Sequence, residues 1–258
     1  MRLMKRILSA AAVLALSASL LVGCSSGTAS SVPVSASSAA ESTVSSVEET
    51  ASSAVDENEA AAAQLLNDLT GSYQELWPVI LADEYKQTWL DDCTALVGEE
   101  NAEVAFEKLS SMVTSDVYGE DAVEAYANGG GAYFCGFTNS LATLTFDGET
   151  STISGTDKDG NVLFSHTYHY IGMEPVHGLY EFESDDADSG EFTYFFLAPD
   201  TSAETYHIEF RYGSDAEALS QYDAGEYAYW VASGISTDCD QTMIDNCIEL
   251  FCTENLAG

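Results

Sequence analysis

The run Leu141-Ala-Thr-Leu-Thr-Phe-Asp-Gly-Glu-Thr-Ser-Thr-Ile-Ser-Gly155 is typical of a β-hairpin. Two short segments with β-forming residues, Leu141–Phe146 and Ser151–Gly155, flank the turn dipeptide Asp147-Gly148. Segments that are joined by so short a turn pair as antiparallel neighbours. This stretch therefore sets the expected fold class for the chain around it.

Further segments of the same kind surround this hairpin. We predict strands at Ala132–Phe137, Leu141–Phe146, Ser151–Gly155, Val162–Tyr170, Leu179–Glu183, Phe192–Leu197 and Thr205–Tyr212. Turn signals at Asp159-Gly160 and Ser189-Gly190 separate some of them. Consecutive short strands with tight turns predict a mainly β fold, an antiparallel barrel or sandwich and not a parallel sheet.

Helices are expected on both sides of the strands. Glu59–Leu69 is rich in Ala, and Glu100–Val113 carries apolar residues at helical intervals. At the C-terminal end, Thr237 or Asp238 can cap a helix with one apolar stripe, formed by Met243, Ile244, Cys247, Ile248 and Phe251. Residues 61–258 are enough for one well-buried domain with flanking N- and C-terminal helices.

The first residues have the pattern of a bacterial lipoprotein signal. Met1-Arg-Leu-Met-Lys-Arg6 is basic, an apolar stretch runs to Val22, and Leu21-Val-Gly-Cys24 ends it. The apolar run contains serines and is short for a membrane span. We therefore predict a signal peptide at residues 1–23, lipidation at Cys24 and an extracytoplasmic protein anchored to the cell membrane by acyl chains.

Residues 24–60 are predicted to be a disordered tether. They are rich in Ser, Ala and Glu and cannot bury enough surface to offset chain entropy. The whole chain has 7 Lys and Arg against 43 Asp and Glu, and a formal net charge of −36. The electric field of so negative a chain repels nucleic acid and anionic lipid and attracts cations, so nucleic-acid binding is excluded.

Five cysteines follow Cys24, namely Cys93, Cys135, Cys239, Cys247 and Cys252. An extracytoplasmic location permits up to two disulfides with one thiol left over, and the sequence alone does not choose the pairing. Cys247 and Cys252 lie within one expected helix, where they cannot bridge each other.

The segment Thr205-Tyr-His-Ile-Glu-Phe-Arg-Tyr-Gly213 contains a histidine, a glutamate and the only arginine outside the N-terminal leader. In a strand, His207, Glu209 and Arg211 share one face, while Ile208 and its alternating neighbours Tyr206, Phe210 and Tyr212 share the other. Imidazole and carboxylate are zinc ligands. Arg211 has two readings, an ion pair with Glu209 or a grip on an anionic ligand.

The start of the domain, Leu66-Asn-Asp-Leu-Thr-Gly-Ser-Tyr-Gln-Glu-Leu-Trp-Pro78, resembles the ZinT family. This is the YodA-type lipocalin-like domain that is also fused to some AdcA zinc-binding lipoproteins. Its pattern L-x-D-W-x-G-x-W-Q-x-x-Y-P is matched by Leu66, Asp68, Gly71, Gln74 and Pro78, with aromatic exchanges at Tyr73 and Trp77. The Gly-x-aromatic element is similar to the first strand of lipocalin-like barrels.

The resemblance implies a zinc-binding protein with a lipocalin-like barrel that works beside an ABC-type zinc importer. The family's three histidines, spaced H-x8-H-x-H, fall on Ala198, His207 and Glu209. A third ligand must come from elsewhere. His166 and His169 lie three apart, hence on opposite faces of a strand, and we take His169 as the third candidate; His177 is expected in a turn.

Two functions follow. The first is a membrane-anchored lipoprotein that binds zinc or another divalent metal through His207, Glu209 and His169, and assists an importer. The second is a lipocalin-like domain whose aromatic interior holds a small apolar or anionic ligand without metal. An enzyme is not expected, since the sequence has no nucleophile motif, phosphate loop or H-E-x-x-H.

Overall fold

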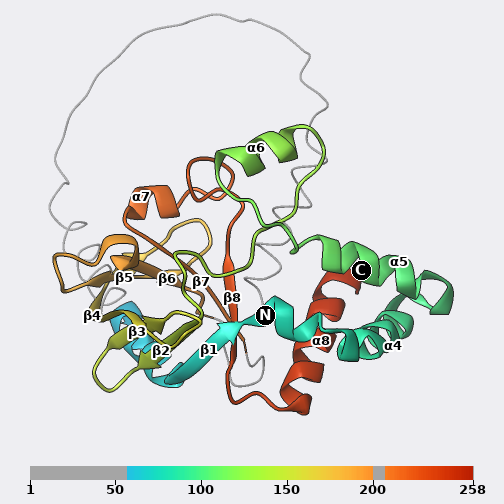
Figure 1. Ribbon diagram of the computed structural model, residues 1–258, viewed down its shortest axis with the longest axis horizontal. Coiled ribbons are helices and arrows are strands. Elements are labelled where there is room, and N and C mark those ends of the chain that lie inside the picture. The colour runs from blue at the N-terminus through green and yellow to red at the C-terminus, as the bar shows by residue number, and fades with distance from the viewer. Residues whose placement is uncertain (1–56, 200–206, 258) are drawn as a thin grey trace, which may run out of the picture.

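A computed structural model describes residues 57–199 and 207–257, and its centre is a closed antiparallel β-barrel (Figure 1). The strands are β1 (Gly71–Glu75), β2 (Thr143–Asp147), β3 (Thr152–Thr156), β4 (Val162–Met173), β5 (Tyr180–Ser184), β6 (Tyr194–Leu197), β7 (His207–Gly213) and β8 (Ala232–Ser236). Each strand pairs with its neighbours in the chain, and β1 pairs with β8 to close the ring. This is the order of up-and-down, lipocalin-like barrels, so the predicted fold class is confirmed.

The hairpin that set the fold class forms β2 and β3. Phe146 lies opposite Ile153 across the Asp147-Gly148 turn. Leu144 and Phe146 are buried while Thr143 and Thr145, which alternate with them, are partly exposed, which is the alternation of a strand with one face on a core.

One predicted strand is wrong, and two observed strands are missing from the seven that were predicted: β1, which only the family resemblance suggested, and β8. Residues 132–137 form no strand, and Phe134 makes only isolated bridges, to Thr114 and Trp230. The eighth strand, β8, is Ala-Ser-Gly-Ile-Ser, a composition with little β preference. Gly234 fits there because β7 is close: a Cβ at this position would lie 3.0 Å from the Ile208 side chain.

Helices cover the barrel on one side and at its ends (Figure 1). They comprise residues 57–68, α3 (Leu76–Ile80), α4 (Lys86–Val97), α5 (Glu99–Ser111), α6 (Glu120–Ala127), α7 (Ala216–Leu219) and α8 (Gln241–Leu256), with short 3-10 turns at Asp83–Tyr85 and Gly190–Phe192. The first helix begins at residue 57, so residues 57–60, which were assigned to the tether, are helical. The cap of α8 is Asp240, which accepts a hydrogen bond from Met243 N, and not Thr237 or Asp238.

The helices α4, α5 and α8 form a layer beside the barrel (Figure 1). Trp89 of α4 is fully buried, donates its indole N–H to the carbonyl of Ile80 over 2.7 Å, and meets Phe251 of α8 edge to face. The predicted apolar stripe of the last helix supplies its buried side, with Ile244, Cys247, Ile248 and Phe251 all buried. Packing of this stripe stabilises the layer.

The interior of the barrel is a packed core. Phe195 and Phe210 have no exposed surface, and Phe146 and Phe182 have 1% each. A side chain that a water-sized probe cannot touch lines no cavity, and eight strands enclose a space that side chains can fill. The predicted alternative of a ligand inside this barrel is therefore not supported by its packing.

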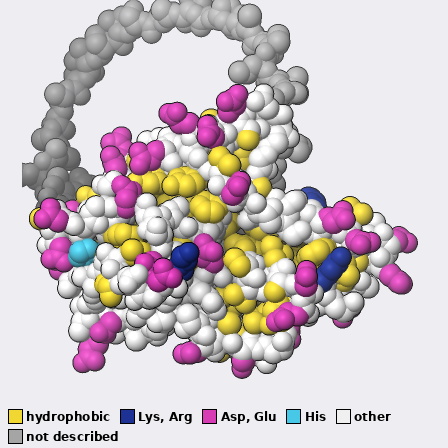
Figure 2. All heavy atoms as spheres, in the orientation of Figure 1, with side chains coloured by type: hydrophobic (Ala, Val, Ile, Leu, Met, Phe, Trp, Pro, Cys, Tyr) yellow, Lys and Arg dark blue, Asp and Glu magenta, His cyan; other side chains and the backbone are white. Residues whose placement is uncertain are grey.

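The surface that Figure 2 shows carries acidic side chains over much of its extent and few basic ones. Of the helices in residues 57–199 and 207–257, none has the length and apolar character needed to cross a bilayer. The predicted signal peptide at 1–23, lipidation at Cys24 and the tether up to residue 56 lie outside the described residues.

Candidate functional site

The predicted ligand pair lies on β7 and points outward from the barrel. Phe210 points inward, where its ring centroid lies 6.3 Å from that of Phe195. Because side chains alternate along a strand, His207, Glu209 and Arg211 point the other way. The predicted division of this segment into two faces is confirmed for residues 207–213, while Tyr206 lies outside the described residues.

This outer face is covered by other parts of the chain. His207 is 7% exposed and Arg211 is fully buried, whereas Glu209 is partly exposed. On the neighbouring strand β8, Ile235 lies opposite His207 and Ser233 lies opposite Glu209. The polar side chains of β7 therefore lie in a partly dry environment, where electrostatic interactions are stronger than in water.

Ala198 takes the position that the family resemblance gave to a first histidine. Its backbone N–H donates to the carbonyl of Glu209 over 2.9 Å, so it lies directly beside the pair, just past the end of β6. The methyl group cannot ligate a metal. Residue 198 therefore lies beside residue 209, but the side chain at this first of the three positions has no atom that can bind a metal ion.

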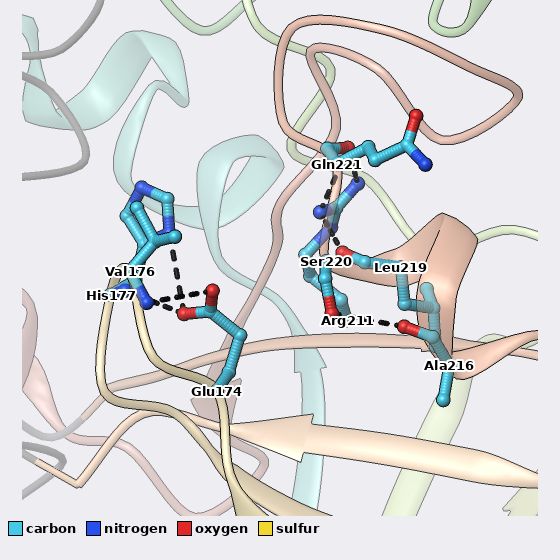
Figure 3. Close-up of polar contacts among 8 residues, drawn as sticks. All are labelled: Glu174, Val176, His177, Arg211, Ala216, Leu219, Ser220 and Gln221. Carbon is cyan, nitrogen blue, oxygen red and sulfur yellow. Dashed lines mark hydrogen bonds and ion pairs between the residues drawn. The ribbon is translucent and has the colours of Figure 1, made fainter.

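Arg211 holds the loop after α7 against the barrel (Figure 3). Its Nη1 donates to the carbonyls of Leu219 and Gln221, and its Nη2 donates to those of Gln221 and Tyr227, the last over 2.5 Å. Within the described part of the chain, the guanidinium makes these bonds to backbone carbonyls instead of an ion pair with Glu209. Both terminal nitrogens donate their N–H groups to carbonyls of the loop. The guanidinium therefore cannot also donate the two parallel hydrogen bonds of a bidentate contact with an anion.

Tyr222 connects this arginine to a second polar group. The guanidinium carbon of Arg211 lies 4.2 Å from the ring centroid of Tyr222, and the ring of His177 lies 3.7 Å from the same ring. Burial lowers the pKa of Arg211, an effect that Tyr222 opposes. We call Glu174, His177, Arg211 and Tyr222 the outer-face cluster.

Glu174 is the acidic member of the outer-face cluster and is fully buried. Its carboxylate accepts hydrogen bonds from the backbone N–H groups of Val176 and His177, at 2.9 and 2.5 Å (Figure 3). The Nδ1 atom of His177 lies 3.4 Å from Oε2. Burial by itself raises the pKa of Glu174, but the His177 ring and these N–H groups outweigh it and lower the pKa below its ordinary value.

Cys135 lies on the other side of the pair, next to the start of β8. Its carbonyl accepts a hydrogen bond from Ser233 N over 3.0 Å. Burial, followed by the negative charge of Glu209, raises the pKa of the Cys135 thiol.

The structure does not bring His169 to this pair. His169 is on β4, opposite Glu183, and its Nδ1 lies 2.8 Å from Asp185 at the surface. Three inter-strand steps separate β4 from β7, about 14 Å around the barrel wall. His169 and His207 therefore cannot share one metal ion, and the predicted three-ligand set does not converge.

Neither of the other two histidines joins His207 and Glu209: His166 is on β4, and His177 is in the outer-face cluster beside Tyr222. His166 and His169 are on opposite faces of β4, as predicted: His166 lies opposite the buried Ile153 and contacts Asp186 over 2.7 Å. His177 is in the turn that was expected for it. Among residues 57–199 and 207–257, no three His, Cys, Asp or Glu side chains are grouped so as to hold a metal ion.

The outer-face cluster is the part that sequence reasoning missed. Glu174 and Tyr222 are separated from Arg211 along the chain, and no motif joins them. One signal was available: Glu174-Pro-Val-His177 is a turn sequence in which an acidic side chain can accept the N–H groups that follow it. Nothing comparable marks Tyr222.

A scan of protein-family models found no match, and a search of characterised protein sequences found none either. The solved structures that resemble the fold include two with Zn(II) bound. One is the Zn(II)-bound ZinT-like domain of AdcA from Streptococcus pneumoniae, with 15% sequence identity and a TM-score of 0.45, over 71% of this chain and 89% of that chain.

The other is Zn(II)-bound AdcA from the same organism, with 14% identity and a TM-score of 0.41, over 74% of this chain and 35% of that one. The chain is thus structurally similar to a ZinT-like domain, which is the resemblance that its sequence indicated.

Proposed function

We propose that this protein is an extracytoplasmic, membrane-anchored barrel domain that binds a divalent metal, zinc in the first place, through His207 and Glu209. The observation that carries the proposal is the placement of both side chains on the same face of β7, two residues apart. Their Cα atoms are about 7 Å apart along a strand. Imidazole and carboxylate side chains can close that distance onto one ion at bond lengths of about 2 Å.

Such a site would exchange its metal readily. Zinc takes four ligands in tetrahedral sites, so two protein donors leave positions for water or for a group on a partner. Weak coordination suits a protein that collects metal and passes it to an ABC-type importer at the same membrane. The acidic surface supports this role because it raises the local concentration of cations.

Isothermal titration with zinc tests the proposal on the chain from residue 25 onward, which lacks the predicted leader and Cys24. We expect His207→Ala and Glu209→Gln each to weaken binding at least tenfold, since each removes a ligand. His169→Ala is the matched control, because His169 lies on β4 beside Asp185, and it should leave binding unchanged. Circular dichroism confirms that the buried His207 variant is folded.

Two results would contradict the proposal. One is a lack of zinc binding at micromolar concentration in the unmodified chain. The other is zinc binding that His207→Ala leaves intact, which would move the site elsewhere on the acidic surface.

The second function is the binding of a small organic ligand. A pocket outside the barrel is a specific location for it. The pocket has a volume of about 320 Å³ and lies between α3 and residues 113–136. Its walls are mostly apolar, with Trp77, Leu81 and Phe134, and Glu75 is at its edge. Native mass spectrometry of protein purified without added metal separates the two functions: a co-purifying organic mass supports this one, and the mass of one zinc ion supports the first.

A further inference from the structure

Two of the five cysteines that the structure describes meet in the helical layer. Cys93 of α4 and Cys252 of α8 have no exposed surface, and their Sγ atoms are 3.9 Å apart. They are 159 residues apart in the chain. Cys135 lies elsewhere, beside the start of β8.

The helices that carry these two cysteines are already packed together. Trp89 of α4 and Phe251 of α8 are in edge-to-face contact, with ring centroids 5.9 Å apart, and each is close in sequence to one of the cysteines. A disulfide requires an S–S distance of about 2.05 Å. Bringing the sulfurs together takes a shift of about 2 Å, which rotations about the Cα–Cβ bonds can supply without separating the helices.

We propose that Cys93 and Cys252 form a disulfide in the mature protein. The inference uses the predicted extracytoplasmic location, where disulfides form and persist, but not the metal site. The oxidant is a protein or small-molecule disulfide. The Cys93 thiolate attacks it and releases one thiol; the Cys252 thiolate then attacks the mixed disulfide at the Cys93 sulfur and releases the second. Each cysteine loses one proton, and the two electrons reduce the oxidant to two thiols.

The bond forms before α8 docks on α4. In the folded chain both sulfurs are out of reach of an oxidant, and burial raises the pKa of each thiol. Protein that folds while reduced therefore stays reduced, whereas protein that folds in a disulfide-containing medium acquires the bond. Once formed, the disulfide is hidden from reductants by the same packing.

The test refolds the chain from residue 25 onward, which retains all described residues, in a mixture of reduced and oxidised glutathione. Alkylation in denaturant then counts free thiols, and peptide mapping identifies the bridge. We expect at least two fewer alkylated cysteines than after refolding with reductant, and a peptide that links Cys93 to Cys252. Cys135→Ser is the control that keeps the bridge, and Cys93→Ser loses it.

Melting temperatures provide a second test, which remains informative if a cysteine variant packs poorly. Refolded, oxidised protein should melt about 10 °C above reduced protein, because the bridge closes a long loop in the unfolded chain. Cys93→Ser and Cys252→Ser should melt at the same temperature in either medium. Five free thiols after refolding, or a peptide that links Cys93 or Cys252 to any other cysteine, would overturn the proposal. Zinc titration is independent of both outcomes.

Discussion

Replacing Arg211 by methionine tests whether this residue is a structural clamp. The guanidinium is fully buried and donates to the carbonyls of Leu219, Gln221 and Tyr227. A buried carbonyl that loses its partner costs about 1–3 kcal/mol, so three of them represent about 3–9 kcal/mol. The methionine side chain fills most of the volume but offers no donor.

Two effects reduce this figure. Removal of a buried cation relieves its desolvation, which is worth several kcal/mol. The loop that contains the three carbonyls also has exposed positions, at 221 and 223–226, where water can replace the lost donor. We therefore expect a net loss of about 3 kcal/mol in the free energy of unfolding, and a melting temperature about 9 °C lower for a domain of this size.

Urea unfolding followed by tryptophan fluorescence measures the loss. Lys158→Met is the matched control because Lys158 is an exposed basic residue in a turn, and its loss should change stability by less than about 0.5 kcal/mol. Arg211→Lys should fall between the two, since an ammonium group cannot span three carbonyls. If Arg211→Met is as stable as Lys158→Met, the clamp reasoning is refuted.

Two further predictions concern a buried acid and a close approach. Because the pKa of Glu174 is lower in the folded protein than in the unfolded chain, its stabilising effect is complete above the unfolded pKa of about 4.3 and is lost as the pH falls through the folded pKa. Glu174→Gln should therefore be less stable than the unmodified chain at pH 7 and should lose less stability on acidification, as pH-dependent unfolding would show. Gly148→Ala should cost about 2 kcal/mol, since its Cβ would lie 2.4 Å from the Cα of Asn67, whereas Gly172→Ala, which meets only a Glu181 oxygen at 3.9 Å, should cost under 1 kcal/mol in the same thermal melt; equal losses would contradict this.

The strands that could be predicted from the sequence are those with a local signal. The β2–β3 hairpin has apolar alternation and an Asp-Gly turn, and β7 alternates over its whole length. Strand β8 has neither, and its central Gly234 fits the close approach of the neighbouring Ile208 side chain. Such a requirement comes from tertiary packing and leaves no pattern in the segment itself.

In the candidate site too, the features with a local sequence signal could be predicted and those that depend on tertiary contacts could not. That His207 and Glu209 share a face depends only on the period of a strand, and this prediction is confirmed. The partners of Arg211 depend on a loop that follows it by 8 to 16 residues and folds back over the barrel wall. Because Glu209 is two residues away, an ion pair was the simplest prediction for Arg211. Its guanidinium instead donates to backbone carbonyls that would otherwise be buried without donors, and these provide more hydrogen-bond partners than one carboxylate.

Closure of the barrel also limits how this protein can be recognised. Since β1 pairs with β8, every strand within residues 57–199 and 207–257 has two neighbours, and the barrel wall that these residues form offers no free sheet edge. A peptide therefore cannot add itself as a further strand, and two copies cannot join edge to edge. A partner of this domain must therefore recognise its side chains, and most of the charged ones are acidic.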